Sequence, residues 1–427
     1  ENGITENLTE TQGIREVFPA WSPDGKYISY YSDKTGEYEL WIIENKKGAE
    51  PRQVTFKSAA WKYQPQWSPD SRHLLFFDRT MKLRLVEAST GKITDVDQAT
   101  SSEIRSYSFS PDSRWITYTR EGENEKPAIW VYDIPASTKH QLTDGTFADD
   151  SPVFSLDGNY IFFASARDYN LSFSSFDFDY IYDRATRLYA MALTPKSPKL
   201  SKDKNDTEPV KEEKKAEPAA KDAKSKKALT PAEDTPAEEK KVKVEIEFNG
   251  INNRVTALPG EAGEYRIVGA ADGGLIFMND GKLMKYNIEE EKNEEILDRA
   301  MSVSITADGK MAMYRSGPDY GIIKLTPGQK AGAGKLNLDG LEMKIDPRKE
   351  WDQIYTDAWR IFRDFFYVNN IHGVNWPEMK ERYSALLPFV SHRADLDYIL
   401  NEIMAESNTG HSYVDWGDFK KVKRVDT

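Results

Sequence analysis

The sequence contains no cysteine among its 427 residues and no apolar run of the length that crosses a membrane. The lack of thiols excludes disulfide scaffolds, thiolate nucleophiles, zinc knuckles and iron–sulfur clusters. A membrane-spanning helix would need about 18–20 consecutive apolar residues. Because a cysteine-free chain tolerates either redox environment, this absence leaves the cellular compartment open.

Basic residues are the minority among the charged ones. The chain has 58 Lys and Arg against 70 Asp and Glu, a net charge of −12. Binding to nucleic acid requires clustered cations that displace the counterions of the phosphates, so we expect no nucleic-acid partner. The length suggests two to three domains at about 150 residues each. The chain starts Glu1-Asn2-Gly3, without an initiator Met, and we expect it to be a mature or excised piece of a longer protein.

One phrase recurs along the first half of the chain: an aromatic residue, a Ser-Pro-Asp turn and an apolar run. Its copies begin at Trp21, Trp67 and Phe109, with a weaker one at Phe154, and their aspartates recur every 42–46 residues. Proline presets φ at such a turn, and Asp and Gly accommodate the reversal of the chain. An unrelated β-sandwich is the alternative, but a period of this length with several strands in each unit favours propeller blades.

Each unit has the strands of a four-stranded blade. Third strands are predicted at Tyr38–Ile43, Leu83–Val86, Ile129–Tyr132 and Arg187–Ala190. More degenerate blades follow up to residue 345, two of them complete and one partial. The fold class is therefore mainly β, a propeller of six or seven four-stranded blades over residues 1–345. Ile4–Thr9 resembles a fourth strand, which either closes the ring or is left from a propeller upstream.

Residues 196–243 interrupt the pattern. They include 14 Lys and 11 Asp or Glu but no aromatic residue. So little apolar surface cannot offset the conformational entropy of folding, and we expect a disordered, charged loop inserted into a blade. After it, the alternation in Val244–Phe248 predicts a strand.

From residue 346 to 427 the apolar period becomes helical. Asp346 and Pro347 fit the cap and first turn of one helix, and a second is expected from Asn375-Trp376-Pro377. A third is expected after Ser391, followed by Thr409–Val414 with a short strand. Three helices in about 80 residues make a small α-helical subdomain that is less than a domain of ordinary size.

The histidines and aspartates show no metal-ligand spacing, and we expect neither a metal nor a cofactor. His73 and His140 fall in predicted blade strands, and His372 and His392 flank helices as caps or surface residues. Asp177, Asp179 and Asp183 lack the spacing of a calcium loop. There is also no Gly-x-Ser-x-Gly elbow, Walker loop or dinucleotide fingerprint.

Several segments together resemble the bacterial tricorn proteases. They are Phe176-Asp177-Phe178-Asp179-Tyr180-Ile181-Tyr182-Asp183-Arg184, Glu350-Trp351-Asp352-Gln353, Ala358-Trp359-Arg360-Ile361-Phe362-Arg363-Asp364-Phe365-Phe366, His372-Gly373-Val374-Asn375-Trp376, Arg393-Ala394-Asp395-Leu396 and Thr409-Gly410-His411-Ser412-Tyr413-Val414. The resemblance implies two propellers, a helical first catalytic subdomain, a PDZ domain and a second catalytic subdomain. This chain would then hold the second propeller and the first catalytic subdomain, and would end before the PDZ domain.

The resemblance also implies a chemistry for His411. In tricorn-type serine peptidases the equivalent histidine is the general base for a serine nucleophile, and an imidazole with a pKa of about 6.5 suits that role. The nucleophile, the oxyanion hole and the orienting acid would lie in the second catalytic subdomain, outside this chain. Some relatives have a hydroxyl residue where Gly410 stands. Ser412 is a poor nucleophile, because its neighbour His411 cannot readily reach it.

Two functions are therefore compared. The first is a serine-type peptidase acting on oligopeptides, incomplete and inactive as this fragment, with the propeller as a substrate channel or sieve. By resemblance the full protein would need no cofactor, would be a homo-oligomer, and would lie in the cytoplasm, with the periplasm as the alternative. The second is a binding module like the propellers of the Tol system. Such a module has no need for the Thr-Gly-His-Ser-Tyr sequence after three helices.

Overall fold

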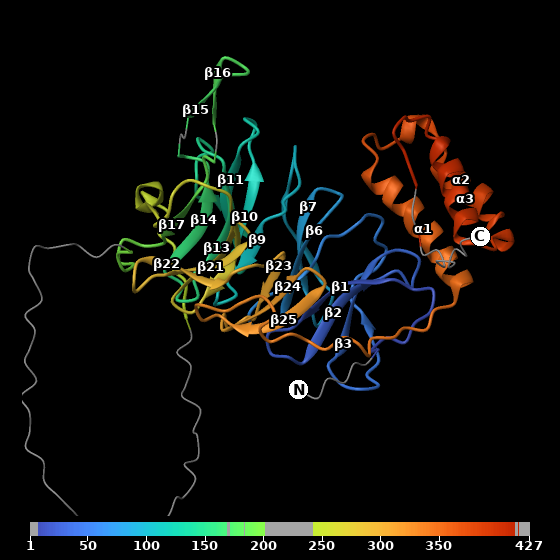
Figure 1. Ribbon diagram of the computed structural model, residues 1–427, viewed down its shortest axis with the longest axis horizontal. Helices are drawn as coiled ribbons and strands as arrows, with labels where there is room; N and C mark the ends of the chain where they lie inside the picture. The colour runs from blue at the N-terminus through green and yellow to red at the C-terminus, as the bar shows by residue number, and fades with distance from the viewer. Residues whose placement is uncertain (1–6, 169–170, 183, 201–241, 415–416, 418–427) are drawn as a thin grey trace, which may run out of the picture.

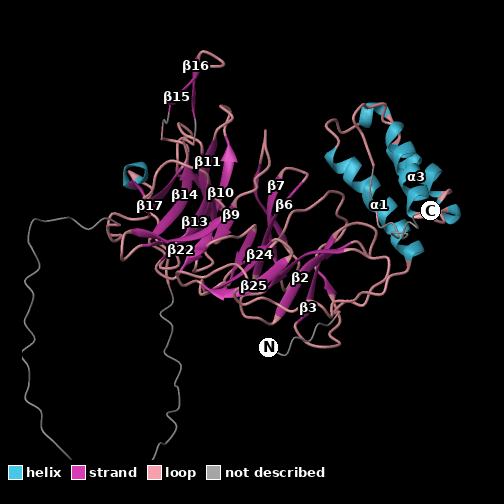
Figure 2. Cartoon of the chain, viewed as in Figure 1, coloured by secondary structure: helices cyan, strands magenta, loops and turns pink. Residues whose placement is uncertain are grey.

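The computed structural model describes residues 7–168, 171–182, 184–200, 242–414 and 417. Six β-sheets are arranged around a ring as propeller blades, and three α-helices lie together beside one side of that ring (Figure 1). The three α-helices all follow the strands in the chain, and a short 3-10 helix, Ile251–Arg254, lies within the propeller (Figure 2). The predicted fold class is confirmed, with six blades.

The first five blades have four strands and the sixth has three. Blades 1 to 3 consist of β1 (Glu16–Trp21), β2 (Tyr27–Ser32), β3 (Glu39–Glu44), β4 (Arg52–Gln53), β5 (Gln66–Trp67), β6 (His73–Asp78), β7 (Lys82–Glu87), β8 (Ile93–Gln98), β9 (Tyr107–Phe109), β10 (Trp115–Glu121), β11 (Pro127–Asp133) and β12 (Thr138–Gln141). Blades 4 to 6 consist of β13 (Asp149–Phe154), β14 (Tyr160–Ser165), β17 (Arg187–Ala192), β18 (Val255–Ala257), β19 (Tyr265–Ala271), β20 (Gly274–Asn279), β21 (Lys282–Asn287), β22 (Lys292–Leu297), β23 (Ser302–Ile305), β24 (Met311–Ser316) and β25 (Asp319–Lys324).

The Ser-Pro-Asp turns of blades 1 and 2 hold their own blades internally and link blade 1 to blade 2 and blade 2 to blade 3. In blade 1 the Ser22 hydroxyl donates to Asp24 at 2.6 Å and accepts from the Tyr27 N–H at 2.9 Å. The Asp24 N–H donates to the Ser71 hydroxyl of blade 2 at 3.2 Å. The corresponding bond from Asp70 to Ser113 of blade 3 is 3.0 Å. The repeated phrase therefore fixes both the blade and its spacing to its neighbour.

Apolar side chains fill the space between successive blades. Clusters join blade 1 to 2, 2 to 3, 3 to 4, 4 to 5 and 5 to 6, with completely buried Phe76, Phe77, Ile161, Phe162 and Leu283 among their members. A further cluster of Ile28, Tyr30, Trp41 and Ile43 lies on the other face of blade 1. Burial of apolar area on this scale is the dominant favourable contribution to folding.

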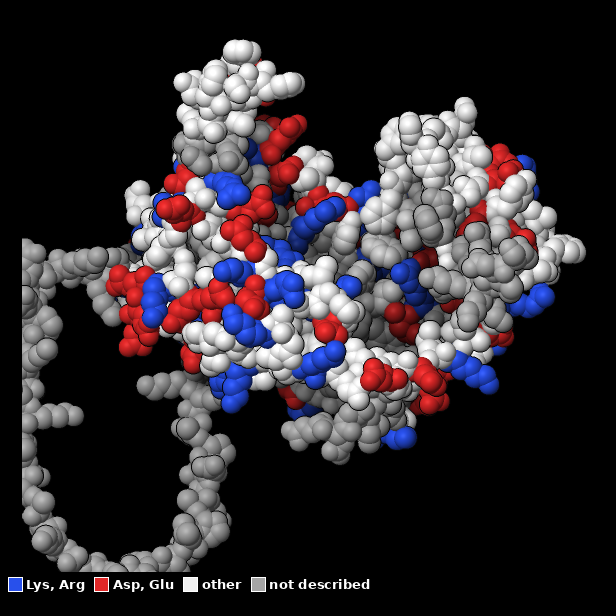
Figure 3. Space-filling model, in the orientation of Figure 1, with Lys and Arg blue, Asp and Glu red and all other residues white. Residues whose placement is uncertain are grey.

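Blade 4 carries an insertion that the strand pattern did not predict. A hairpin, β15 (Leu171–Ser174) and β16 (Asp179–Tyr182), lies between β14 and β17 and projects from the ring (Figure 1). Its tip carries Asp177 and Asp179 together with two exposed rings, because Phe176 and Phe178 are 92% and 81% exposed, and the face seen in Figure 3 is mostly uncharged. The predicted third strand β17 still pairs with β14, so the hairpin extends the blade without breaking its order.

The inserted charged segment lies outside the described residues over 201–241, but its two ends are placed. Leu200 is buried in the cluster of blades 4 and 5. The predicted strand Val244–Phe248 is wrong, because this segment forms no ladder with a neighbouring strand. It is held by single hydrogen bonds instead, and its alternate side chains, Val244, Ile246 and Phe248, pack on the core of blades 3 and 4. The alternation was therefore a sign of one-sided burial.

The ends of the propeller differ from the prediction for Ile4–Thr9. Residues 1–6 lie outside the described part, and residues 7–9 form no strand. In blade 6 no fourth strand is described beside β25. Lys335 lies there instead and forms a single antiparallel bridge with Gly321.

The helices are α1 (Pro347–Phe365), α2 (Trp376–Ser384) and α3 (Arg393–Ala405), as predicted. The Asp346 carboxylate caps α1 by accepting from the Arg348 N–H, and Asn375 caps α2. Trp359, Trp376, Leu396 and Leu400 are buried in their common core. Among the described residues no helix has the length and apolarity to span a membrane. The boundary predicted at residues 345 and 346 stays a prediction.

Candidate active site and the docked helical region

The segment that carries His411 is anchored to α3. The Asn401 side chain accepts a hydrogen bond from the Val414 N–H at 3.1 Å and donates one to the Val414 carbonyl at 3.0 Å. Before the histidine, buried Ser407 donates to the Met404 carbonyl at 2.8 Å, and the Thr409 hydroxyl donates to the Ser407 carbonyl at 3.2 Å. The segment is thus held at both ends, although the short strand predicted there does not form.

The His411 side chain is exposed, and its backbone φ is 60°. Its Nδ1 lies 3.4 Å from the Tyr413 hydroxyl, and the two rings meet edge to face with centroids 6.3 Å apart. The left-handed backbone turns the chain sharply at this residue, so the imidazole stands out from the anchored segment. Such a ring is accessible to a group that approaches from outside the described chain.

The other histidines are not gathered around His411. His73 lies in β6 and His140 in β12, as predicted. His392 is the N-cap of α3 and forms a capping box with Asp395, also as predicted. His372 is exposed, and its Nδ1 lies 2.9 Å from the Ser407 carbonyl, so it supports the segment that leads to His411.

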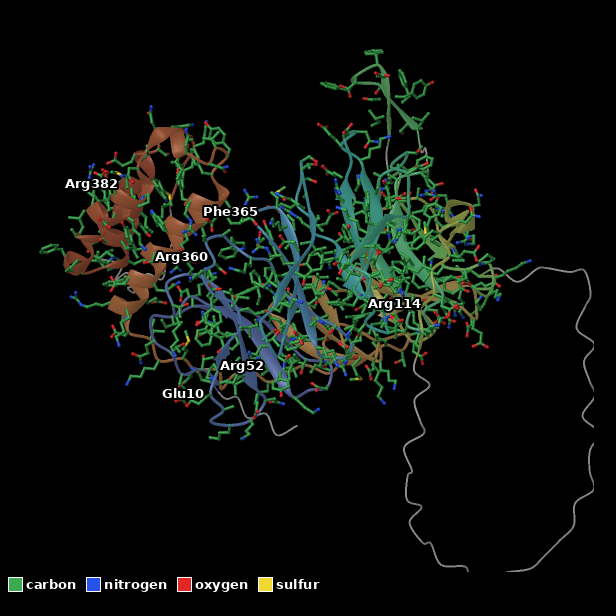
Figure 4. The ribbon with its side chains drawn as sticks, turned by 180° about the vertical axis from the view of Figure 1, so that it is seen from behind. Glu10, Arg52, Arg114, Arg360, Phe365 and Arg382 are labelled. Atoms are coloured by element: carbon green, nitrogen blue, oxygen red, sulfur yellow. The ribbon has the colours of Figure 1, made fainter. Side chains whose placement is uncertain are left out.

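Charged side chains of α1 dock the helical region onto the loops between second and third strands. Arg360 is 3% exposed, lies 2.9 Å from Asp33 and donates to the Gly36 carbonyl. Arg363 forms two bonds with Glu37, at 2.7 and 3.0 Å. Figure 4 shows Arg360 and Phe365 on the propeller side of the helical region and Arg382 on its far side.

Further polar contacts join α1 to blade 1 and to the segment that leads into blade 2. Asp357 accepts from the Tyr38 hydroxyl at 2.8 Å and from Arg15. Burial raises the pKa of the Tyr38 phenol well above its ordinary value, and the neighbouring Asp357 adds to the shift. The Asp364 carboxylate accepts from the Trp61 N–H at 2.8 Å. The helical region therefore lies against the loop side of the ring, opposite its Ser-Pro-Asp turns.

A cavity of about 540 Å³ lies along the innermost strands of blades 2 to 6. Its wall contains mostly small or neutral residues, such as Ser106, Ser108, Gly269 and Ser304, together with prolines of the Ser-Pro-Asp turns. Among the described lining residues Arg105 alone is charged. Apart from this arginine, the wall presents uncharged groups to whatever occupies the cavity.

Sequence reasoning missed the groups that dock α1 on the propeller. Asp33, Glu37 and Tyr38 lie in an ordinary polar turn, and nothing in the repeat distinguishes them. One signal was available: Asp357, Arg360 and Asp364 recur at helical spacing on α1, opposite its aromatic residues. In the part of the chain that the structure describes, no group of three or more His, Asp or Glu residues could hold a metal ion.

These features define a six-bladed propeller protein with a helical region docked on its loop side and an exposed imidazole on that region. A family model described as the tricorn protease second beta propeller domain matches residues 1–326. Another, described as the tricorn protease C1 domain, matches residues 347–405. The chain therefore belongs to the tricorn protease family, which confirms the resemblance read from the sequence.

Full-length relatives match nearly the whole chain. Tricorn protease homolog 1 of Streptomyces coelicolor is 22% identical over 97% of this chain and 40% of its own length. The tricorn protease of Thermoplasma volcanium is 25% identical over 93% of this chain and 36% of its own length. A crystal structure of the tricorn protease covers 95% of this chain with a TM-score of 0.74 at 17% identity, with 38% of that chain matched. This chain thus spans about 40% or less of these proteins.

Proposed function

We propose that the chain is the non-nucleophile part of a serine-type peptidase that hydrolyses oligopeptides. The observation that carries the proposal is the exposed His411 ring on a segment held by α3, within a chain of the tricorn protease family. With the proton on Nδ1, beside the Tyr413 hydroxyl, that N–H donates to an orienting acid from outside this chain and leaves the Nε2 lone pair free. Nε2 then takes the proton of a serine hydroxyl and later returns it to the leaving amine.

The serine nucleophile and the groups that stabilise the oxyanion come from a segment outside this chain, beyond a PDZ domain. This fragment alone is therefore inactive. The propeller acts as a channel or sieve that admits unfolded peptides and excludes folded proteins. Apart from Arg105 its central wall is uncharged, which suits extended peptides of varied sequence. The full protein is a homo-oligomer without a cofactor. We place it in the cytoplasm by family resemblance, with the periplasm as the alternative.

The test compares this fragment, the full-length protein and its variants on fluorogenic tripeptides. We expect an inert fragment, an active full-length protein, and loss of kcat by several orders of magnitude in His411→Ala. The matched control is His140→Gln in β12, which should retain activity. Full turnover in His411→Ala would remove this residue from the mechanism.

One similarity favours the second candidate, a Tol-type binding module. A TolB homolog of Chlorobium chlorochromatii is 33% identical over 168 residues, which is 38% of this chain. That match does not account for the helical region. The same assay separates the two functions, because a pure binding module predicts a full-length protein without peptidase activity.

A further inference from the structure

A groove of about 930 Å³ lies between blades 1 and 2, on the Ser-Pro-Asp side of the ring and away from the docked helices. Its apolar wall includes Tyr27, Ile42, Trp67 and Ala88. Side chains of both charge signs surround that wall: Glu44, Lys46, Glu50, Arg52, Arg72 and Glu87. The size and the mixture of surfaces are those of a binding groove for a ligand with apolar and polar parts.

The repeat shows what such a groove holds, because the corresponding groove between blades 3 and 4 is filled by the chain itself. There, residues 242–248 run in an extended form, and the Val244 N–H donates to Asp112 at 2.8 Å. The Trp115 indole donates to the Val244 carbonyl at 3.4 Å. The Phe248 ring stacks on His140 with centroids 4.2 Å apart.

The two grooves correspond residue by residue. In the turns, the Asp24–Tyr27 segment matches Asp112–Trp115, and Asp70-Ser71 matches Asp157-Gly158. In the outer strands, Ile42 pairs with Arg52 as Val131 pairs with His140. The Ala88 N–H donates to the Arg72 carbonyl as the Leu193 N–H donates to the Asn159 carbonyl. Four residues that contact the segment 242–248 in the groove of blades 3 and 4 have a counterpart in the wall of the groove of blades 1 and 2. These pairs are Trp115 and Tyr27, His140 and Arg52, Gly158 and Ser71, and Leu193 and Ala88.

The backbone acceptor of the groove is also matched. The Leu193 carbonyl accepts from the Glu247 N–H of the bound segment at 2.9 Å. Its counterpart, the Ala88 carbonyl, accepts from the Arg52 side chain instead. An incoming peptide N–H can replace that guanidinium, because Arg52 is exposed and its long side chain can turn outward.

We propose that the groove between blades 1 and 2 binds an extended segment of a separate polypeptide that has apolar side chains at alternate positions. The bound segment places those side chains on Ile42, Trp67 and Ala88 and directs its intervening polar residues to the charged rim. The recognition is that of residues 242–248 in the neighbouring pair of blades. This binding site depends on neither His411 nor peptide hydrolysis.

The experiment uses the full chain and a fluorescent peptide with the sequence of residues 242–249, Val-Lys-Val-Glu-Ile-Glu-Phe-Asn, followed by anisotropy. We expect saturable binding to one site. A peptide with Ser in place of its valines, isoleucine and phenylalanine should bind at least about tenfold more weakly, because it loses the apolar contacts. Equal binding of the two peptides would overturn the proposal.

Variants at Ser71 locate the site. A Cβ at the matching Gly158 would lie 2.9 Å from Val242 and 3.0 Å from Val244, so a side chain there points at the bound segment. Ser71→Leu should therefore weaken binding about tenfold or more; it also loses the bond that Ser71 accepts from the Asp24 N–H, and a leucine at position 113 loses the equivalent bond from Asp70. The control is Ser113→Leu, at the same turn position in blade 3 and with the same φ of 59°.

Two outcomes would refute the location. If Ser71→Leu binds the peptide as the unchanged chain does, the peptide binds elsewhere, for instance by displacing residues 242–248 from their own groove. If the chain binds the peptide only after residues 1–6 are deleted, the groove belongs to the N-terminus of this chain, and a separate polypeptide is not its ligand.

Discussion

The buried ion pair of Arg360 and Asp33 should account for much of the stability of the docked state. The Arg360 side chain is 4% exposed and that of Asp33 is 5% exposed, with 2.9 Å between Nη1 and Oδ2. In Arg360→Met the stem of the side chain is kept, but the Asp33 carboxylate loses its buried cation. Removing one partner of a buried pair costs about 3–5 kcal/mol, because the remaining charge stays out of water.

The assay is urea unfolding followed by tryptophan fluorescence and by helical circular dichroism. We expect the helical signal of Arg360→Met to be lost at a clearly lower urea concentration than in the unchanged chain. The matched control is Arg382→Met on α2, whose ion pair with Glu378 is more than half exposed on both sides. An exposed pair contributes about 0–1 kcal/mol, so this control should unfold almost normally.

A second substitution tests whether the effect comes from the unpaired charge. Asp33→Asn removes that charge. Its amide oxygen can still accept from the Arg15 backbone N–H, which lies 2.9 Å from Asp33 Oδ1 in the unchanged chain. Combined with Arg360→Met it should recover about 1–2 kcal/mol relative to Arg360→Met alone. If Arg360→Met is no more destabilising than Arg382→Met, or if the double variant recovers nothing, the buried charges do not hold the helical region in place.

Three further predictions concern the propeller. Burial lowers the pKa of Lys62 to about 8, so between pH 8 and its unfolded value of 10.5 only the unfolded chain holds the proton. The free energy of unfolding of the unchanged chain, relative to Lys62→Met, should thus be flat below pH 8 and rise by up to about 3 kcal/mol towards pH 10.5; a flat difference throughout would contradict this. Gly274→Ala should cost about 1–3 kcal/mol in thermal unfolding, because its Cβ would lie 1.9 Å from the Tyr286 carbonyl oxygen, whereas Gly340→Ala, with no atom within 4 Å, should change little. Phe176→Ser with Phe178→Ser should reduce the binding of an apolar dye without changing the melting temperature, since both rings are exposed; a lower melting temperature would show that they pack in the native fold.

The blades and helices could be predicted because their signals are local. A Ser-Pro-Asp turn determines where a strand ends, and the caps Asp346 and Asn375 determine where helices begin. The segment Val244–Phe248 failed because alternation reports one-sided burial, whether or not hydrogen bonds form a ladder. The hairpin β15–β16 was missed because an extra pair of strands in one blade breaks the period on which the prediction depended.

The candidate site was only partly predictable for a similar reason. His411 was singled out by resemblance to a family, while its supports Asn401, Ser407 and His372 depend on how α3 and the preceding loop come together. The docking partners Asp33 and Arg360 are 327 residues apart. No local pattern identifies a pair that only the tertiary structure brings into contact.

The polar character of the docking interface also bears on assembly. The apolar face of α1 packs on α2 and α3, and its propeller-facing side presents Asp357, Arg360 and Arg363 together with Phe365, whose ring meets Trp61. If the two parts were made as separate polypeptides, each would therefore expose a mainly charged surface at this interface, with Phe365 and Trp61 as its apolar part. Such parts could associate after each had folded, because complementary charges favour the correct partner over non-specific association.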